Sequence, residues 1–288
     1  MTPRPRNRID RRRLEARLDR LIFDNRITIA ITFPLVGVLL LVSGQVGLLP
    51  EWLAFNPYLM VAAVTVMALP LIGGLVPLVD RRVAAGLVVL VVFTWAIELT
   101  GVHTGYPYGE FQYERPLGPM LLDSIPLFLP VFYFPILLNS YLLATLFLGR
   151  RSSLWHQYLL TLTIVITMDL VLDPGAVALE FWGWTDGGSY YDVPVQNYVG
   201  WLLSGSAAVF VLTVSLDHDA VVDRLEECDY FLDDLISFGI FWGLVNAYFL
   251  NLVPFAIAVV LLATLFRVDW FDFAGLGTGG PGRHSREG

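Results

Sequence analysis

The chain has 288 residues, of which 56% are hydrophobic and only 15% are charged, and its mean hydropathy is +0.65. Soluble domains carry about 25% charged residues, so this composition excludes an ordinary soluble protein and indicates a single membrane domain. All 18 basic residues are arginine, and the net charge is −8. An acidic, lysine-free exterior stays hydrated at high salt and favours a halophilic source, although a GC-rich genome would also replace lysine by arginine. The single Cys228 excludes an intrachain disulfide and a cysteine metal cluster.

The N-terminal region, residues 1–26, holds nine of the 18 arginines together with acidic residues at helical spacing. The apolar run that follows, 27–49, is long enough to cross a bilayer, which takes about 20 residues. It is too long for a signal peptide and lacks a cleavage site. The positive-inside rule keeps an arginine-rich segment in the cytoplasm, so we predict a cytoplasmic amphipathic segment at 1–26.

Further apolar runs predict spans at about 57–78, 83–100, 121–148, 154–172 and 198–215. The last run, 235–266, would reach about 48 Å as one helix, against a hydrocarbon core of ~30 Å. We therefore expect a kinked or broken helix there, with a hairpin of two short segments as the alternative. The predicted fold is all-α, a polytopic membrane helix bundle of about seven spans with a broken last helix. The catalytic membrane domain is predicted at 27–267, followed by a flexible Gly-rich tail at 268–288.

Charges in the short connections predict the orientation of the bundle. Arginine pairs at 81–82 and 150–151 fall on the side of the N-terminus, as does the acidic connection 216–234. The connections 101–120 and 173–197 fall on the opposite side and together contain a single basic residue. The positive-inside rule then predicts a multi-pass protein of the cell membrane with a cytoplasmic N-terminus.

Three carboxylates inside span ends are the candidate catalytic residues: Glu98, Asp169 and Asp173. Asp169 and Asp173 are four residues apart and share one helix face, and Pro174 predicts that this helix ends at Asp173. A carboxylate in hydrocarbon costs about 2.5–3.5 kcal/mol, so it is expected to face the bundle interior and to be functional. Such a group also retains its proton more readily, which suits general-acid work. Asp173 adjoins a predicted turn, where a structural capping role is an equal alternative.

Polar and aromatic residues in the two connections on that same side are the candidates for substrate binding. Trp and Tyr gather at membrane interfaces in any case. Here, however, they alternate with Gly, Pro, Asn and acidic residues, which suits a cleft that binds an extended apolar ligand. The faces of the aromatic rings would also stabilise a positive centre. The candidates are Tyr106, Tyr108, Glu110, Tyr113, Glu180, Trp182, Trp184, Tyr190, Tyr191, Asn197 and Trp201. The sequence has no phosphate loop, nucleophile elbow or zinc spacing, and His103 has no partner at metal-ligand spacing, so no metal or cofactor is expected.

The two blocks resemble the membrane carotenoid hydratases of bacterioruberin synthesis in haloarchaea. The resemblance covers roughly 27–266 and rests on ELTGVHTGYPYG at 98–109, LGP at 117–119, DLVLDP at 169–174, WGW at 182–184, YY at 190–191, VP at 193–194 and NYVGW at 197–201. It implies addition of water to the terminal isopentenyl double bonds of a fifty-carbon carotenoid, bisanhydrobacterioruberin, to give bacterioruberin. The implied partners are the carotenoid and membrane lipid, with other membrane enzymes of the pathway; nucleic acid is not among them.

Protonation of a trisubstituted alkene gives a tertiary carbocation that water captures, which needs a buried acid, a face that stabilises positive charge and a positioned water. Asp169 or Glu98 is the expected acid, with the other orienting water beside Asp173 and Asn197. Two alternatives from other classes are a transporter or channel that uses the intramembrane carboxylates and a carotenoid- or lipid-binding protein without turnover. Inverted repeats would favour a transporter. The two blocks differ in order and content, so the sequence gives no sign of such a repeat.

Overall fold

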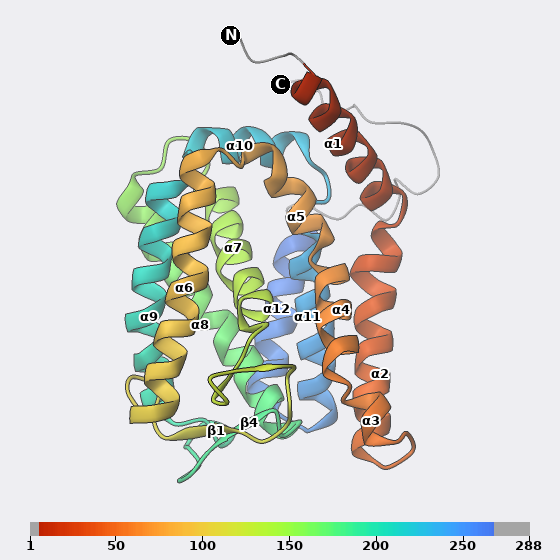
Figure 1. The fold of residues 1–288 in the computed structure, drawn as a ribbon, viewed down its shortest axis with the longest axis vertical. Coiled ribbons are helices and arrows are strands. Elements are labelled where there is room, and N and C mark those ends of the chain that lie inside the picture. The colour runs from red at the N-terminus through yellow and green to blue at the C-terminus, as the bar shows by residue number, and fades with distance from the viewer. Residues whose placement is uncertain (1–5, 268–288) are drawn as a thin grey trace.

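The protein is a bundle of membrane-length helices, seen in a computed structural model that describes residues 6–267 (Figure 1). The predicted Gly-rich tail, 268–288, lies outside the described residues. The N-terminal half comprises α1 (Arg6–Asp24), the π-helical turn η1 (Thr28–Thr32), α2 (Phe33–Gln45), α3 (Glu51–Ala54), α4 (Pro57–Met67), α5 (Leu69–Leu75), the 3-10 turn η2 (Val76–Leu78) and α6 (Arg81–Thr104).

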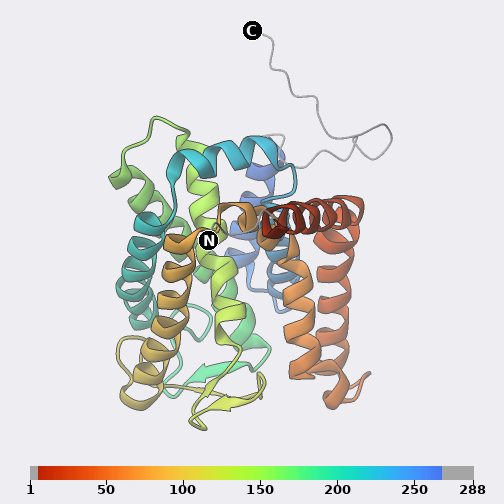
Figure 2. The same ribbon diagram turned by 45° about the horizontal axis from the view of Figure 1, so that its top comes forward.

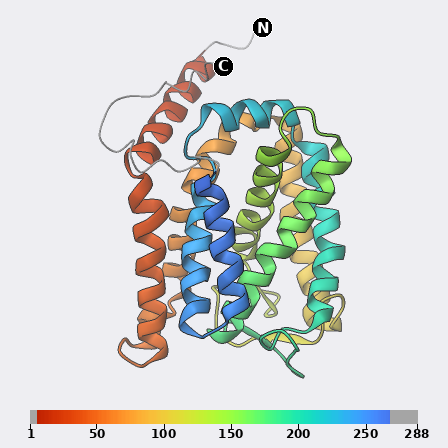
Figure 3. The same cartoon turned by 180° about the vertical axis from the view of Figure 1, so that it is seen from behind.

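The C-terminal half adds short strands to the helices. It comprises β1 (Phe111–Tyr113), β2 (Met120–Leu121), β3 (Ile125–Pro126), α7 (Leu129–Leu148), α8 (Leu154–Ala178), β4 (Trp182–Trp184), α9 (Val195–Ser215), α10 (His218–Glu227), α11 (Asp233–Tyr248) and α12 (Leu252–Arg267). Helix α7 packs on α8, α8 and α6 both pack on α9, and α11 packs on α12 and α2. Figure 3, a view from behind, shows α11 and α12 next to α8, with α9 on the other side of α8.

Five helical segments of residues 6–267 are long and apolar enough to cross a membrane: 28–45, α6, α7, α8 and α9. A sixth crossing is possible if α3–α4 and α5–η2, which meet at a bend of 48°, together form one span. The protein is therefore a multi-pass membrane protein. The prediction of about seven spans is too high on this measure, because the predicted second span is bent and α11 and α12 have only 16 residues each, about 24 Å at 1.5 Å per residue.

The last apolar region is broken into two helices that pack side by side. We favoured a kinked or broken helix, and the structure has the hairpin of two short segments that was the alternative. Leu250 adopts a left-handed conformation with φ of 61° between α11 and α12. The Asn251 side-chain amide donates to the Asn246 amide oxygen at 3.0 Å and to the Pro174 carbonyl at 3.2 Å. The asparagines that interrupt the apolar run thus close a hairpin and fasten it to α8.

Helix α8 continues through Pro174 to Ala178, so the predicted helix end at Asp173 is wrong. A proline inside a helix removes the N–H that would bond the carbonyl four residues earlier, here that of Leu170. The Tyr190 hydroxyl donates to this carbonyl at 3.2 Å, and the Asn246 amide donates to the next carbonyl, of Val171, at 2.8 Å. Side-chain donors therefore replace the bonding that proline interrupts, and the helix carries Asp173 in its interior.

The two connections between α6 and α7 and between α8 and α9 meet in a small antiparallel sheet. Strand β1 pairs with β4, with Phe111 opposite Trp184 and Tyr113 opposite Trp182. Figure 2 shows this sheet at the end of the bundle away from α1. Arg115 fastens it: its guanidinium contacts Glu180 at 2.5 Å and lies 3.9 Å from the centre of the Phe55 ring. The pairing brings the two aromatic blocks of the sequence together over one end of the helices.

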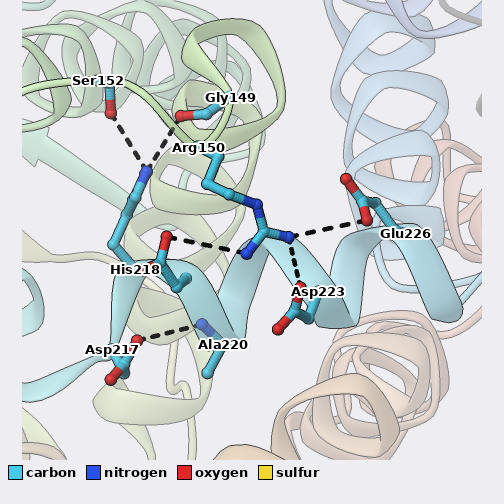
Figure 4. Close-up of polar contacts among 9 residues, drawn as sticks. Gly149, Arg150, Ser152, Asp217, His218, Ala220, Asp223 and Glu226 are labelled. Carbon is cyan, nitrogen blue, oxygen red and sulfur yellow. Dashed lines mark hydrogen bonds and ion pairs between the residues drawn. The ribbon is translucent and has the colours of Figure 1, made fainter.

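The opposite end of the bundle is closed by α10, within the connection 216–234 that the sequence analysis treated as a loop. Asp217 caps α10 by accepting from the Ala220 amide at 3.1 Å. Arg150, just after α7, forms an ion pair with Asp223 of α10, and the His218 ring contacts the Gly149 carbonyl at 3.1 Å (Figure 4). These contacts seal the end of the bundle away from the sheet.

Candidate active site

An apolar cavity lies between α2, α4, α6, α7 and α11 and is closed at one end by the β1–β4 sheet. It contains about 1800 Å³ of empty space, part of it open to the outside. Aliphatic and aromatic side chains make most of its wall, among them Phe33, Leu41, Leu59, Met60, Val64, Ile97, Leu129, Phe132, Ile136, Leu172, Phe238, Phe241 and Trp242. Ligand sites of this kind place a few polar groups in an apolar lining to fix orientation.

Glu98 is the first of the polar groups in the cavity wall, near the C-terminal end of α6. The hydroxyl of Tyr113, on strand β1, donates a hydrogen bond to Glu98 Oε1. Burial, with the Glu98 carboxylate beside it, raises the pKa of Tyr113 well above its ordinary value. Tyr113 therefore remains a neutral donor at any physiological pH and holds the Glu98 side chain in place.

Asp173, on α8, is the second polar group in the cavity wall. The Asn197 side-chain amide, from the first turn of α9, donates to Asp173 Oδ2. The same amide nitrogen lies 3.3 Å from Asp169 Oδ2. Asp169 is fully buried behind Asp173, outside the cavity wall, and its Oδ1 has no hydrogen-bond partner in the described part of the chain. One amide thus joins two carboxyl groups, of which only Asp173 reaches the cavity.

Aromatic rings surround both acidic groups. Phe111 has its centroid 6.0 Å from that of Tyr113 and 6.2 Å from that of Trp184, and Tyr113 has its centroid 6.4 Å from that of Trp182. These four rings come from the paired strands and line the cavity. Their faces provide negative electrostatic potential, so the cavity near the carboxyl groups is suited to a centre of positive charge.

Eight of the predicted residues line this cavity: Glu98, Tyr108, Tyr113, Asp173, Trp182, Trp184, Asn197 and Trp201. The other predicted binding residues lie elsewhere. Tyr106 is 59% exposed, Glu110 is exposed, and Glu180 pairs with Arg115. Tyr190 donates to α8, as described above, and the Tyr191 hydroxyl accepts from the Val253 amide at 3.2 Å. Tyr190, Tyr191 and Glu180 therefore connect the loops to their surroundings outside the cavity wall, and Tyr106 and Glu110 lie at the surface.

Three residues that the sequence analysis did not select also line the cavity: Tyr133, Trp242 and Asp234. Tyr133 stacks on Trp201 with centroids 5.3 Å apart. Asp234 is buried and accepts from the Asn139 amide at 2.6 Å. Tyr133 and Trp242 stand singly in apolar runs, and Asp234 ends an acidic segment that we assigned to a loop. The rule that a polar residue inside a span is functional would have drawn attention to Asn139, within the predicted span 121–148. It would have missed Asp234, which precedes the predicted span 235–266.

Within residues 6–267, no group of three or more His, Cys, Asp or Glu side chains is placed to hold a metal ion. The fold and site define a membrane-embedded helix bundle whose apolar cavity presents carboxyl groups among aromatic rings.

Comparison with known proteins gives the family. The profile of the carotenoid biosynthesis protein family matches residues 55–265, and the chain belongs to this family. The bisanhydrobacterioruberin hydratase of the haloarchaeon Haloarcula japonica is 51% identical over 259 residues, which cover 90% of this chain and 88% of that protein. No solved structure matches the chain.

Proposed function

We propose that the protein is a membrane hydratase that adds water to the terminal isopentenyl double bonds of bisanhydrobacterioruberin and forms bacterioruberin. The observation that carries the proposal is the pair of acidic centres, Glu98 and Asp173, that face one apolar, aromatic-lined cavity. Such a cavity suits an apolar chain end that must be protonated and then meet water. The similarity to the Haloarcula hydratase supplies the substrate.

The aspartate pair is the proton donor in this proposal. Asp169 and Asp173 lie against the same Asn197 amide in a buried site, and two carboxyl groups this close repel each other when both are charged. They therefore hold one proton between them, and Asp173 presents it to the cavity. Transfer of this proton to the CH carbon of the double bond breaks the π bond and leaves a tertiary cation on the dimethyl carbon.

Glu98 is the proton acceptor. The Tyr113 hydroxyl holds its Oε1 by a hydrogen bond, and the carboxylate receives a proton from water as the water oxygen bonds to the cationic carbon. The rings of Trp182 and Trp184 stabilise the cation before capture. The product is a tertiary alcohol. The aspartate pair has then lost one proton and Glu98 has gained one, and the return of a proton from Glu98 to the aspartate pair through water restores the starting state.

The orientation proposed from the arginine distribution places α1 in the cytoplasm and the β1–β4 sheet on the outer side of the membrane. The carboxyl groups of Glu98 and Asp173 then lie in the outer half of the bundle, and the cavity extends from them toward Asp234 at the start of α11. A cysteine at exposed Tyr106 should react with an impermeant thiol reagent on intact cells, whereas one at exposed Asp223 should react only after lysis. The reverse pattern would overturn this orientation.

The function is tested by supplying membranes that contain the protein with bisanhydrobacterioruberin and separating the pigments. We expect a product heavier by one water per hydrated end. Asp173→Asn and Glu98→Gln should each remove this product while the protein remains folded.

Exposed Glu110, which lies outside the cavity wall, provides the matched control, since Glu110→Gln removes a carboxylate of the same connection without touching the cavity. Unchanged pigment with the wild-type protein would contradict the function. Normal turnover in both active-site variants would contradict the roles of the carboxylates.

A further inference from the structure

Two buried hydroxyl groups beside the carboxyl groups have no role in proton transfer as described above. The Tyr133 hydroxyl on α7 and the Ser204 hydroxyl on α9 are both buried, and neither makes a well-aligned hydrogen bond within the described part of the chain. Buried polar groups in proteins are nearly always paired with protein or with ordered water. The Tyr133 hydroxyl belongs to the cavity wall, and Ser204 follows the lining residues Asn197 and Trp201 at helical spacing on α9. Unpaired hydroxyl groups at the edge of a cavity mark a place where a small polar molecule is held.

These hydroxyl groups are neighbours, although they come from different helices. Tyr133 stacks on Trp201, which lies three residues before Ser204 and on the same face of α9. Tyr133 and Glu98 line the same cavity. The stack of Tyr133 on Trp201, with planes inclined by 23°, fixes the ring and therefore the position of its hydroxyl.

We propose that Tyr133 and Ser204 form the water site of the enzyme and hold the molecule that captures the carbocation. This inference rests on the proposed hydratase function and adds the residues that position the nucleophile. A water in this place donates one hydrogen to the Glu98 carboxylate and the other to a Tyr133 or Ser204 oxygen. Its remaining lone pair faces the cavity, where the cationic carbon forms. Tyr133 and Ser204 act here as positioning residues, since neither exchanges a proton with the substrate.

The step balances without a further reactant. The water oxygen bonds to the dimethyl carbon, its proton passes to Glu98, and the proton added to the neighbouring carbon came from the aspartate pair. If water is not held in place, the cation instead loses a proton from an adjacent carbon and returns to an alkene. Loss of the water site therefore changes how the cation partitions between alcohol and alkene, whereas loss of the acid stops cation formation.

This partition is measured in heavy water (D₂O) with Tyr133→Phe and Ser204→Ala. Each protonation introduces deuterium, which appears in the alcohol after capture and in recovered or isomerised alkene after reversal. We expect the ratio of deuterated alkene to alcohol to rise roughly tenfold in each variant, the effect of about one hydrogen bond. Tyr133→Phe retains the ring that stacks on Trp201, so a purely structural role would leave this ratio unchanged.

Tyr158→Phe and Ser206→Ala are the matched controls. Tyr158 and Ser206 lie on α8 and α9, outside the cavity wall, and the Tyr158 hydroxyl donates to the Ser206 main-chain carbonyl at 3.3 Å. Both controls should show the wild-type ratio. A wild-type ratio in Tyr133→Phe and Ser204→Ala would overturn the water site. Absence of alcohol with the wild-type protein would instead overturn the hydratase function, so the two failures are distinguishable.

Discussion

The bond from Tyr190 to α8 gives a quantitative prediction about how the helix tolerates Pro174. Replacement of Tyr190 by Phe removes the hydroxyl that donates to the Leu170 carbonyl at 3.2 Å. Because Pro174 has no N–H, no helical donor takes its place. An unpaired polar group costs about 1–3 kcal/mol when buried. This bond is only partly buried, so we expect a loss near the lower limit, about 1 kcal/mol.

A double-mutant cycle separates this hydrogen bond from other effects of the ring. Pro174→Ala restores an N–H four residues after Leu170, and the carbonyl then has a partner on its own helix. Tyr190→Phe should therefore cost about 1 kcal/mol in the wild-type background and close to zero in the Pro174→Ala background, since residues with a shared partner are not additive. The free energies come from unfolding of the detergent-solubilised protein, followed by tryptophan fluorescence. An equal cost in both backgrounds would refute the explanation of how α8 passes Pro174.

Three further predictions concern the acidic centre, a buried ion pair and a close helix contact. Asp173→Asn should lower the hydration rate by roughly 10²–10⁴-fold, the usual contribution of a general acid, with an unchanged melting temperature; a rate within threefold of wild type would exclude Asp173 as the donor. Arg26→Met leaves the fully buried Asp233 side chain without its partner at 2.7 Å and should cost about 3–5 kcal/mol in unfolding free energy, most of which a second substitution, Asp233→Leu, should restore. Gly74→Ala should cost roughly 1–3 kcal/mol, because its Cβ would lie 2.0 Å from the fully buried ring of Phe231; unfolding curves that match wild type would show that the ring can move.

The sequence predicts the membrane class and most of the long helices, because hydropathy measures how much apolar chain is available to cross a bilayer. It predicts less well where helices bend or end. The bend of 48° within the predicted second span and the continuation of α8 through Pro174 depend on tertiary contacts. In α8 the decisive contact is a hydroxyl from Tyr190, which is separated from Leu170 by 20 residues. No local pattern reports such a donor.

The sequence likewise predicts some residues of the candidate site and misses others. Glu98 and Asp169 were the carboxylates favoured as functional, because a carboxylate in a span is costly, whereas Asp173 was left equally open to a capping role. The structure places Glu98 and Asp173 on one cavity, and Asp169 lies outside the cavity wall. Their roles as acid and base remain proposals. Pairing of β1 with β4 decides which aromatic residues reach the cavity, and this register is a long-range feature. Nothing in the sequence distinguishes Tyr133 as a site residue, because a single tyrosine in an apolar helix has a structural role as often as a functional one.

Hydration itself is tested most directly by the origin of the product oxygen. The purified protein is incubated in detergent with bisanhydrobacterioruberin and water enriched in heavy oxygen, and the pigments are weighed by mass spectrometry. The account predicts one heavy oxygen in each newly formed tertiary alcohol, with no requirement for molecular oxygen and with loss of the product in Asp173→Asn. An alcohol that carries ordinary oxygen taken from dioxygen, or no alcohol at all, would contradict it.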